Sequence, residues 1–500
     1  MTPKQERNID MKKIIATLLV LTMMLSMLVI GTSAAAWDGT SASASLKGEG
    51  TADNPYLVET AEDLKYIQVQ VNEGNKFEGK YFKQTADIDL GNKEWTPIGE
   101  RTAKPFIGLY DGNGYKIVNF YQTFQYRFGG LFAYMKQVDG FTPGLINITL
   151  EGKMDTVTRK GDIYAGALLG WTDQSKTGSA LNDNKVLVAN CVTDVDMNFD
   201  STGVGITASC IIAPVFSRTG SVIVSNCVNN GDINVVADGH QITVGGVVAY
   251  LVDGDLINCV NNGKITISGP TLDIYAGGVV GAVATSLGVC KVENSINNGE
   301  VNTAGGGAGY VGGVVGCVSS AVGVAINNCA NVASVTSKSV SDAKLPYAGG
   351  VLGYTARPKV VVSNSYNSGA IATANDNKTG HAPGGIAGVL NNSEATTYIE
   401  KCVTTTDTFK GWFNAANEAK DCTTGADASV VANAAKAIKA TVDGTKSATV
   451  NGATFAFVYP AAPETPVEPS VPTGDAAIVF VMIALVSLAG VVVTKKVTSR

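Results

Sequence analysis

A six-residue phrase recurs along this chain and constrains its fold more than any other feature. Residues 226–231 read Asn-Cys-Val-Asn-Asn-Gly, and related copies begin at Asn258, Asn294, Asn328 and Asn364. The steps between the copies are 32, 36, 34 and 36 residues. A fixed period in this range is typical of a solenoid whose repeats stack on one another. The sequence therefore predicts one long repeat array, which needs no large globular core.

A second phrase, built on a Gly-Gly pair, follows about twenty residues downstream of each copy, as at residues 276–281. Between the two phrases, short segments such as residues 264–267 alternate polar and apolar side chains, which is typical of strands. Asn and Gly tolerate positive φ, so Asn-Asn-Gly indicates a turn. Stacked parallel strands place like residues about 4.8 Å apart, with apolar columns inside and asparagine ladders at turns. We predict an all-β, right-handed parallel β-helix.

The ends of such a solenoid need covering, because their strand edges are unpaired. Thr60 followed by Glu62 and Asp63 resembles a capping box that opens a helix reaching about Asn72. Residues 428–442 have helical spacing of apolar side chains, and residues 449–454 indicate a tight hairpin. We expect small helical caps at both ends.

Both ends of the chain carry targeting features. A basic stretch at Met11, Lys12 and Lys13 precedes an apolar run at residues 14–30 and small residues ending at Ala36. This order predicts a secretory signal peptide that starts at Met11 and is cleaved after Ala36. An uncleaved N-terminal helix is the alternative.

At the other end, a proline-rich linker leads to an uncharged apolar run at residues 476–493, long enough to span a bilayer. The basic tail at residues 494–500 is expected on the cytoplasmic side. The array would then lie outside the cell, anchored by its C-terminus. The predicted segments are a signal peptide (1–36), a linker (37–48), an N-terminal cap with the first coils (49–141), the repeat array (142–402), a C-terminal cap module (403–459), the proline-rich linker (460–475), the transmembrane helix (476–493) and the tail (494–500).

Five of the nine cysteines occupy one slot of the repeat, where Ser295 and Ser365 stand in other copies. A slot that accepts Cys or Ser requires a small side chain, so we predict a buried ladder of reduced thiols. Strand spacing does not forbid a disulfide between neighbouring coils, so that alternative stays open. The cysteines of this slot are Cys191, Cys227, Cys259, Cys329 and Cys402.

Residues 50–56, 106–115 and 129–132 resemble the start of bacterial GLUG-motif surface proteins, and the array repeats a Gly-Val-x-Gly variant of that motif, as at residues 278–281. The resemblance implies a pectate-lyase-like β-helix on an exported protein with a binding or adhesion role. The C-terminal layout is similar to the sorting region of Gram-positive cell-wall proteins, with Thr473 and Gly474 as its Thr-Gly pair. No leucine precedes Pro472, which abuts Thr473, so sortase attachment and simple membrane anchoring both stay open.

No catalytic set stands out. The only histidines, His240 and His381, fall in loops, and no Cys-x-x-Cys or His-Glu-x-x-His occurs. The carboxylate pairs Asp87/Asp89 and Asp194/Asp196 each lie on one face of a strand. Such pairs could bind calcium or perform acid–base chemistry, as in β-helix polysaccharide lyases and hydrolases, or they are solvated strand faces. We expect no cofactor.

Two features could contact a ligand. Variable loops precede the Gly-Gly strands, and loops on one edge of a repeat protein often form its binding face. The second feature is an aromatic stretch whose exposed side chains would be Tyr121, Phe124 and Tyr126; core packing is the alternative. The loops cover residues 237–240, 268–271, 337–346 and 374–383.

These observations predict an exported, C-terminally anchored surface protein of Gram-positive type. Its expected role is a non-catalytic adhesin or a scaffold that binds a glycan or a host protein. Low charge (16% of residues, net −6) argues against a nucleic-acid partner. A polysaccharide lyase or hydrolase and a passive structural stalk are the alternatives.

Overall fold

The computed structural model divides the chain into two units, Met1–Tyr459 and Pro460–Arg500. All described residues lie in the first unit. No helix among them is long and apolar enough to cross a membrane. The predicted transmembrane helix, the proline-rich linker, the Thr473-Gly474 motif and the signal sequence before Ala36 lie outside the described residues. The described ranges are 36–100, 102–123, 127–156, 161–173, 185–216, 221–238, 240–269, 273–286, 288–305, 307–320, 322–339, 345–375 and 383–458.

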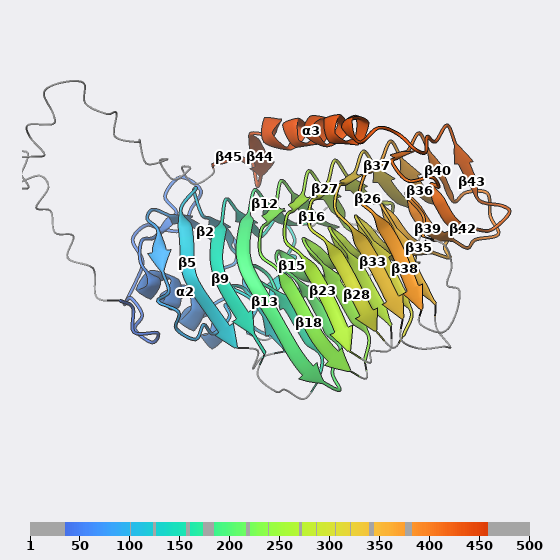
Figure 1. Cartoon of the computed structure of the whole chain (residues 1–500). Coiled ribbons are helices and arrows are strands. Elements are labelled where there is room, and N and C mark those ends of the chain that lie inside the picture. Colours follow the sequence, from blue (N-terminus) through green and yellow to red (C-terminus); the bar gives the residue numbers. More distant parts are fainter. Residues whose placement is uncertain are drawn as a thin grey trace, which may run out of the picture. The chain divides into compact units, whose positions relative to one another are not determined.

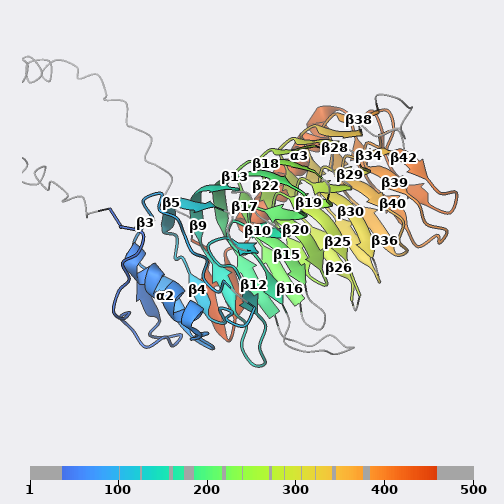
Figure 2. The ribbon, with the colours of Figure 1, turned by 90° about the horizontal axis from the view of Figure 1, so that it is seen from below.

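Short parallel strands wind into a β-solenoid of the right-handed type, which confirms the predicted fold class of the array (Figure 1). Successive coils of the array add one strand to each of three sheets, here called A, C and D, and two strands to a fourth, here called B. One coil shows the order: β22 (Val260–Asn261) and β23 (Ile265–Gly269) in sheet B, β24 (Ile274–Gly277) in sheet D, β25 (Val280–Ala284) in sheet C and β26 (Cys290–Glu293) in sheet A. Figure 2, seen from below, shows strands of successive coils side by side, with β25 between β20 (Val248–Val252) and β30 (Val315–Ser320).

Sheets D and C carry the surface described below. In the described residues, sheet D contains β6 (Phe128–Gly129), β10 (Ile163–Gly166), β14 (Ile206–Ser209), β19 (Ile242–Gly245), β24, β29 (Gly309–Gly312) and β34 (Pro346–Gly349). Sheet C contains β7 (Met135–Lys136), β11 (Thr172–Asp173), β15 (Ile212–Phe216), β20 (Val248–Val252), β25, β30 (Val315–Ser320), β35 (Leu352–Thr355), β39 (Ala387–Leu390) and β42 (Lys410–Phe413).

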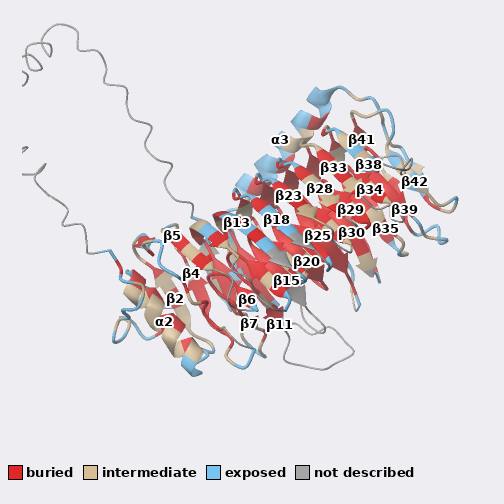
Figure 3. Cartoon of the chain, turned by 60° about the horizontal axis from the view of Figure 1, so that its bottom comes forward, coloured by how far each residue is buried: buried red, intermediate tan, exposed pale blue. Residues whose placement is uncertain are grey.

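Sheets A and B complete each coil. The strands of sheet A used below are β2 (Tyr81–Gln84), β4 (Leu109–Asp111) and β40 (Tyr398–Glu400), and its last is β43 (Glu418–Lys420). Those of sheet B are β3 (Ile88–Asp89), β5 (Lys116–Thr123), β9 (Thr149–Asp155) and β13 (Val192–Thr202). Figure 3 shows that buried residues recur in the strands of every coil along the array.

The first and last residues of the repeated phrase have different structural roles. Its first asparagine, rather than the Asn-Asn-Gly triplet, adopts the left-handed conformation, with φ of 55° at Asn226 and 59° at Asn258. Asparagine tolerates this conformation better than most residues. The closing glycine is needed for space, because a Cβ on Gly263 would lie 1.9 Å from the carbonyl oxygen of Gly231. The chain does bend at Gly231, but the predicted positive φ within the Asn229-Asn230-Gly231 triplet was wrong, because the left-handed residue is Asn226 at the preceding corner.

The interior contains the two predicted ladders. The second asparagines of the phrase are fully buried, and each donates its amide to the next coil, as Asn261 Nδ2 does to Asn297 Oδ1 at 2.8 Å. The five cysteines of the slot are free thiols and are also fully buried. Ser295 completes the column by accepting a hydrogen bond from the backbone nitrogen of Cys259 at 3.2 Å.

Helix α2 (Ala61–Glu73) closes the N-terminal end. Thr60 is its N-cap, and Thr60 and Asp63 form a reciprocal capping box, as predicted. The buried face of α2, which includes Leu64, Ile67 and Val71, joins the core of the first coils.

The C-terminal helix and hairpin form where the sequence places them, but they do not cover the last coil. Helix α3 (Ala428–Gly444) lies along the flank of the solenoid, where Ile438 and Val442 pack on Val260 and Ile296 (Figure 1). The hairpin of β44 (Ser447–Val450) and β45 (Ala453–Ala456) continues to the N-terminal coils. We call residues 428–458 the strap. Sheets A and C meanwhile continue past residue 402, into β43 and β42.

Candidate functional site

One outward slot of sheet D repeats along the solenoid. In β24, Ile274 and Ala276 point into the core and are buried, so Tyr275 between them faces outward and is half-buried. Strand pairing places its counterparts in register on every neighbouring coil. From the N-terminal end, the slot contains Phe128, Tyr164, Thr207, Thr243, Tyr275, Tyr310 and Tyr347. Aromatic residues thus occupy both ends of this column, and threonines occupy its middle.

The last three tyrosines of the column stack. The ring centroids of Tyr275 and Tyr310 are 5.0 Å apart at 11°, and those of Tyr310 and Tyr347 are 5.4 Å apart at 20°. Tyr354, from β35 of sheet C, packs edge-on against Tyr310 at 4.7 Å. Neighbouring rings cover one another's faces inside the stack, so its outward surface consists mainly of ring edges and hydroxyl groups.

Tyr250 adds a ring that lies along the solenoid axis. Its hydroxyl is 3.2 Å from Ser319 Oγ, two coils away. Strand pairing shows this separation, because Tyr250 pairs with Ala282 and Ala282 pairs with Cys317, which lies on the same coil as Ser319. The side chain therefore crosses two coils above small residues, and Ala282 and Cys317 are each only 3% exposed. We call Tyr250, Tyr275, Tyr310, Tyr347 and Tyr354 the tyrosine patch.

Four hydroxyl groups of the patch, those of Tyr275, Tyr310, Tyr347 and Tyr354, remain neutral. Burial raises the pKa of Tyr275 to about 12 and also raises the pKa values of Tyr310, Tyr347 and Tyr354. A protonated phenol both donates and accepts hydrogen bonds. The patch therefore combines apolar rings with a row of neutral polar groups.

A second aromatic cluster lies at the N-terminal end of the same slot. The ring centroids of Tyr164 and Trp171 are 4.7 Å apart, and those of Phe128 and Trp171 are 5.0 Å apart. The guanidinium of Arg127 lies 5.4 Å from the Tyr164 ring centroid. We call Arg127, Phe128, Tyr164 and Trp171 the tryptophan patch. Thr207 and Thr243 separate it from the tyrosine patch.

Only Tyr121 of the predicted aromatic site lies within the described residues. Tyr121 lies half-buried on β5, with the Lys153 ammonium 5.0 Å from its ring centroid, while neighbouring Phe120 is a core residue. Phe124 and Tyr126 lie outside the described residues. The tyrosine column was missed although it leaves a sequence signal: Tyr275, Tyr310 and Tyr347 each stand two residues before a Gly-Gly pair.

The predicted carboxylate pairs have mainly structural partners. Asp87 accepts a hydrogen bond from the backbone nitrogen of Lys116 at 2.8 Å, and Asp89 accepts from that of Gly91 at 2.7 Å. Asp196 accepts from the backbone nitrogen of Asp232 at 3.0 Å. Asp194 differs, because burial and its neighbour in register, Glu151, raise its pKa.

The described ranges contain no group of three or more His, Cys, Asp and Glu side chains placed to hold a metal ion. Of the two histidines, His240 is exposed and His381 lies outside these ranges. The predicted contact loops are described only in part; their described residues connect sheet B to sheet D, so they border the aromatic column.

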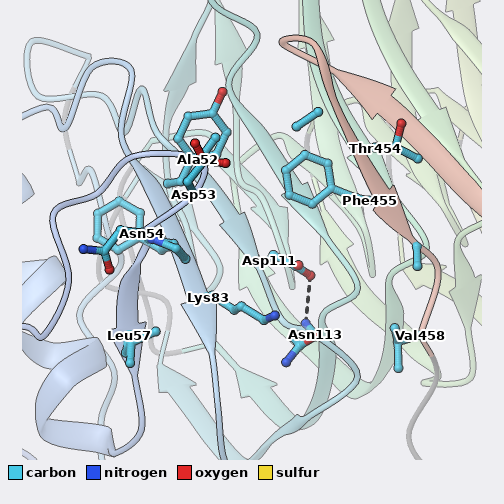
Figure 4. Close-up of a pocket in the computed structure, with 15 residues that line it drawn as sticks. Ala52, Asp53, Asn54, Leu57, Lys83, Asp111, Asn113, Thr454, Phe455 and Val458 are labelled. Carbon is cyan, nitrogen blue, oxygen red and sulfur yellow. Dashed lines mark hydrogen bonds between the residues drawn. The ribbon is translucent and has the colours of Figure 1, made fainter.

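A pocket of about 560 Å³ lies between the first coils and the strap (Figure 4). Its walls come from the segment before β1 (Tyr56–Val58), from β2 and β4, and from β45 of the strap. One side presents Lys83, Asp111 and Asn113, and the other presents apolar groups that include Phe455 and Val458 (Figure 4). Residues more than 300 positions apart in the chain thus share one cavity.

The fold places the chain among parallel β-solenoid proteins, but no known protein-family model matches it. A "Putative Gly-rich membrane protein" of Evansella cellulosilytica is 37% identical over 125 residues, which are 25% of this chain and 14% of that protein. Halomucin of Haloquadratum walsbyi is 27% identical over 158 residues, 30% of this chain and 2% of that protein. The chain therefore spans a small part of the length of either relative.

Among solved structures, the chain is similar to "a putative immunoglobulin A1 protease from Bacteroides ovatus", with a TM-score of 0.45 and 17% sequence identity. The similarity covers 82% of this chain and 94% of that one.

Proposed function

We propose that this protein is an exported, C-terminally anchored surface scaffold that binds an extended glycan along the aromatic column of sheet D. The observation that carries the proposal is the tyrosine patch, in which five half-buried rings and their hydroxyl groups share one outward surface. The patch exposes ring edges and hydroxyl groups, so a sugar can place its C–H groups against the ring edges and form hydrogen bonds with the phenols.

The column also favours a polymer over a compact ligand. Coils follow one another about 4.8 Å apart, so the seven slot positions from Phe128 to Tyr347 extend for roughly 30 Å along the axis. A chain molecule could contact the tyrosine and tryptophan patches together, and linked contacts raise affinity without any new kind of interaction. Because Tyr275 and Tyr310 are neutral, an uncharged glycan fits this surface better than an ionic polymer.

The surface location is inferred from the targeting features of the sequence. The names of the two relatives, a Gly-rich membrane protein and a halomucin, support it, as does the resemblance to GLUG-motif surface proteins. Whether a sortase acts at Thr473-Gly474 can be tested by cell fractionation. Thr473→Ala would abolish release of the protein by muramidase if it is attached to the wall, and would change nothing if residues 476–493 are the anchor.

Binding can be tested with the purified whole chain on a glycan array, followed by titration of any glycan that is retained. Tyr310→Thr installs the residue that the chain itself uses at Thr207 and Thr243, so the fold is expected to tolerate it. We expect at least a tenfold loss of affinity, about 1.4 kcal/mol. The matched control is Tyr398→Thr on β40, a half-buried outward tyrosine of sheet A.

Failure of every array glycan to bind would remove the proposal. Equal losses for Tyr310→Thr and Tyr398→Thr would also contradict it, because binding would then not depend on the column.

One observation favours a second candidate, a β-helix polysaccharide lyase or hydrolase. Asp194 and Glu151 are in register on adjacent coils, Lys116 forms an ion pair with Glu151 at 2.8 Å, and the pKa of Asp194 is raised. A carboxyl group with a raised pKa is suited to general acid catalysis. Release of reducing or unsaturated sugar ends that Asp194→Asn abolishes, while Asp200→Asn does not, would make this candidate the better one.

A further inference from the structure

The pocket beside the strap has polar atoms that the protein itself does not use. Asp111 Oδ1 accepts hydrogen bonds from the backbone nitrogen of Asn113 at 2.8 Å and from Asn147 Nδ2 at 2.8 Å. Asp111 Oδ2 accepts none among the described residues. Asn113 donates its amide nitrogen to the Gln84 carbonyl at 3.2 Å, which leaves its side-chain oxygen available. One wall of the pocket therefore holds two uncommitted acceptors.

Lys83 supplies a donor on the same wall. Its side chain extends toward Asp111 and Asn113 (Figure 4). Its ammonium is close enough to lower the pKa of Asp111, which burial raises above the ordinary value. No direct ion pair joins Lys83 to Asp111 in the described part of the chain, so a ligand group has room between them.

We propose that this pocket binds a single neutral sugar ring, with its hydroxyls on Asp111 Oδ2, Asn113 Oδ1 and the Lys83 ammonium, and its C–H face on Phe455. This site is separate from the aromatic column. Its volume of about 560 Å³ falls within the range of small-molecule sites.

The arrangement favours a neutral polyol over an anionic ligand. The lining contains the Lys83 ammonium and two carboxylates, Asp111 and the exposed Asp53, so an anion would add unpaired negative charge to a partly enclosed site. Acceptors and a donor stand together on one wall, and hydroxyl groups both donate and accept. The side formed by the strap, with Phe455 and Val458, offers apolar surface.

Binding would also hold the strap in place. Thr454, Phe455 and Val458 belong to the strap, whereas Lys83 and Asp111 belong to the first coils. A ligand that contacts both stabilises their docked arrangement by mass action. We therefore expect ligand to raise the midpoint of strap release as well as to show saturable binding.

The test is saturation-transfer NMR and thermal unfolding of the purified whole chain with glucose, galactose, mannose and N-acetylglucosamine, each as the free monosaccharide. Asp111→Asn keeps an oxygen for Asn113 and Asn147 but turns the pocket-facing acceptor into a donor. Lys83→Met keeps the side-chain length and removes the charge. We expect at least one sugar to bind, with each variant weakening it tenfold or more. The control Asp200→Asn changes an exposed carboxylate of β13 and should leave binding unchanged.

Absence of binding by all four sugars at 10 mM, or tighter binding by glycine or another amino acid zwitterion, would overturn the proposal. Wild-type affinity in both Asp111→Asn and Lys83→Met would also overturn it. Loss of monosaccharide binding in Tyr310→Thr would assign the sugar to the tyrosine patch instead. Tyr310 is not part of the pocket. Failure of the pocket proposal therefore leaves the polymer-binding proposal intact, and failure of the polymer-binding proposal leaves the pocket proposal intact.

Discussion

Asparagine has two separate roles in the repeated phrase, and its position in the phrase determines its role. The first asparagine, as at Asn294, makes a left-handed turn, while the next, as at Asn297, is fully buried. Asn297 donates to Gly299 O at 2.8 Å and to Asn331 Oδ1 at 2.7 Å, and it accepts from Asn261 Nδ2 at 2.8 Å. A buried amide is tolerated here because the neighbouring coils satisfy both its ends.

We predict that Asn297→Ala lowers the free energy of unfolding by about 3 kcal/mol, because it leaves buried partners on Asn261 and Asn331 without hydrogen bonds. Asn298 provides the control. Its amide also donates to a neighbouring coil, to Asn262 Oδ1 of the preceding coil at 2.7 Å, but its side chain is exposed. Asn298→Ala should cost less than about 0.5 kcal/mol. Urea unfolding measures both, and equal effects would mean that burial of the ladder does not matter.

One thiol should differ from the others in reactivity. Burial raises the pKa values of Cys290, Cys317 and Cys329 well above the ordinary range. Cys422 is only half-buried, and its hydrogen bond with Cys402 lowers its pKa to about 7. The thiolate is the reactive form, so its population rises as pH increases through about 7.

Iodoacetamide should therefore modify Cys422 before any other cysteine, with a rate that is half-maximal near pH 7, as followed by peptide mass mapping. Cys402→Ala should shift this pH profile upward by removing the hydrogen bond, whereas Cys329→Ala should not. Earlier modification of a cysteine in the buried slot would contradict the assignment.

At the scale of elements, the helix of the strap could be predicted from the sequence, but the surface on which it packs could not. The spacing of Val431, Ile438 and Val442 predicts α3 and its apolar face, and all three side chains are buried. The spacing of apolar residues does not indicate which surface of the solenoid the apolar face of α3 packs against. The receiving surface is a row of outward apolar residues, including Val260 and Ile296, contributed by different coils. Asn226 Nδ2 then satisfies the carbonyl of Val442 at the end of the helix.

Ile438→Asp should release the strap, because a carboxylate would be buried against apolar residues without a partner. A loss of about 3 kcal/mol of docking energy corresponds to a more than hundredfold rise in the open population. Limited proteolysis within residues 428–458 would report it. Ala440→Asp, at an exposed position of the same helix, is the matched control. Equal resistance of both variants would show that α3 is not held by Ile438.

The same limit applies to the candidate sites. The array, its cysteine slot and the N-terminal helix could be predicted because periodicity and capping are local signals. The tyrosine column could also have been found, since Tyr275 and Tyr310 hold equivalent places in their repeats. The pocket could not have been found from the sequence, because Asp111 and Phe455 come together only when the strap returns to the first coils.

At the scale of the whole molecule, each coil contacts mainly its neighbours, so stability should be close to a sum over coils and their interfaces. Removal of residues 274–308 would join Asp273 to Gly309, which is in register with Ile274. Removal of residues 206–241 would likewise join Gly205 to Ile242, which is in register with Ile206. Both deletions shorten the array by one coil, but only the first removes a member of the tyrosine patch.

We predict that both shortened proteins fold, with similar losses of thermal stability, as seen by circular dichroism. Glycan affinity should fall at least tenfold after removal of residues 274–308 and much less after removal of residues 206–241. A passive stalk would tolerate both deletions equally, so an identical outcome would favour that alternative.

The returning strap has a mechanical consequence. Trp37 packs on Trp95, 6.0 Å between ring centroids, and Val458 bonds to Asn147 Oδ1 at 3.2 Å, so both limits of the described unit sit at the first coils. Tension applied through those two points would strain only the first coils and the hairpin. It would not reach the coils that contain Tyr347 and Tyr354. If the protein is anchored as proposed, shear would peel the hairpin away before it unwound any coil of the proposed binding surface.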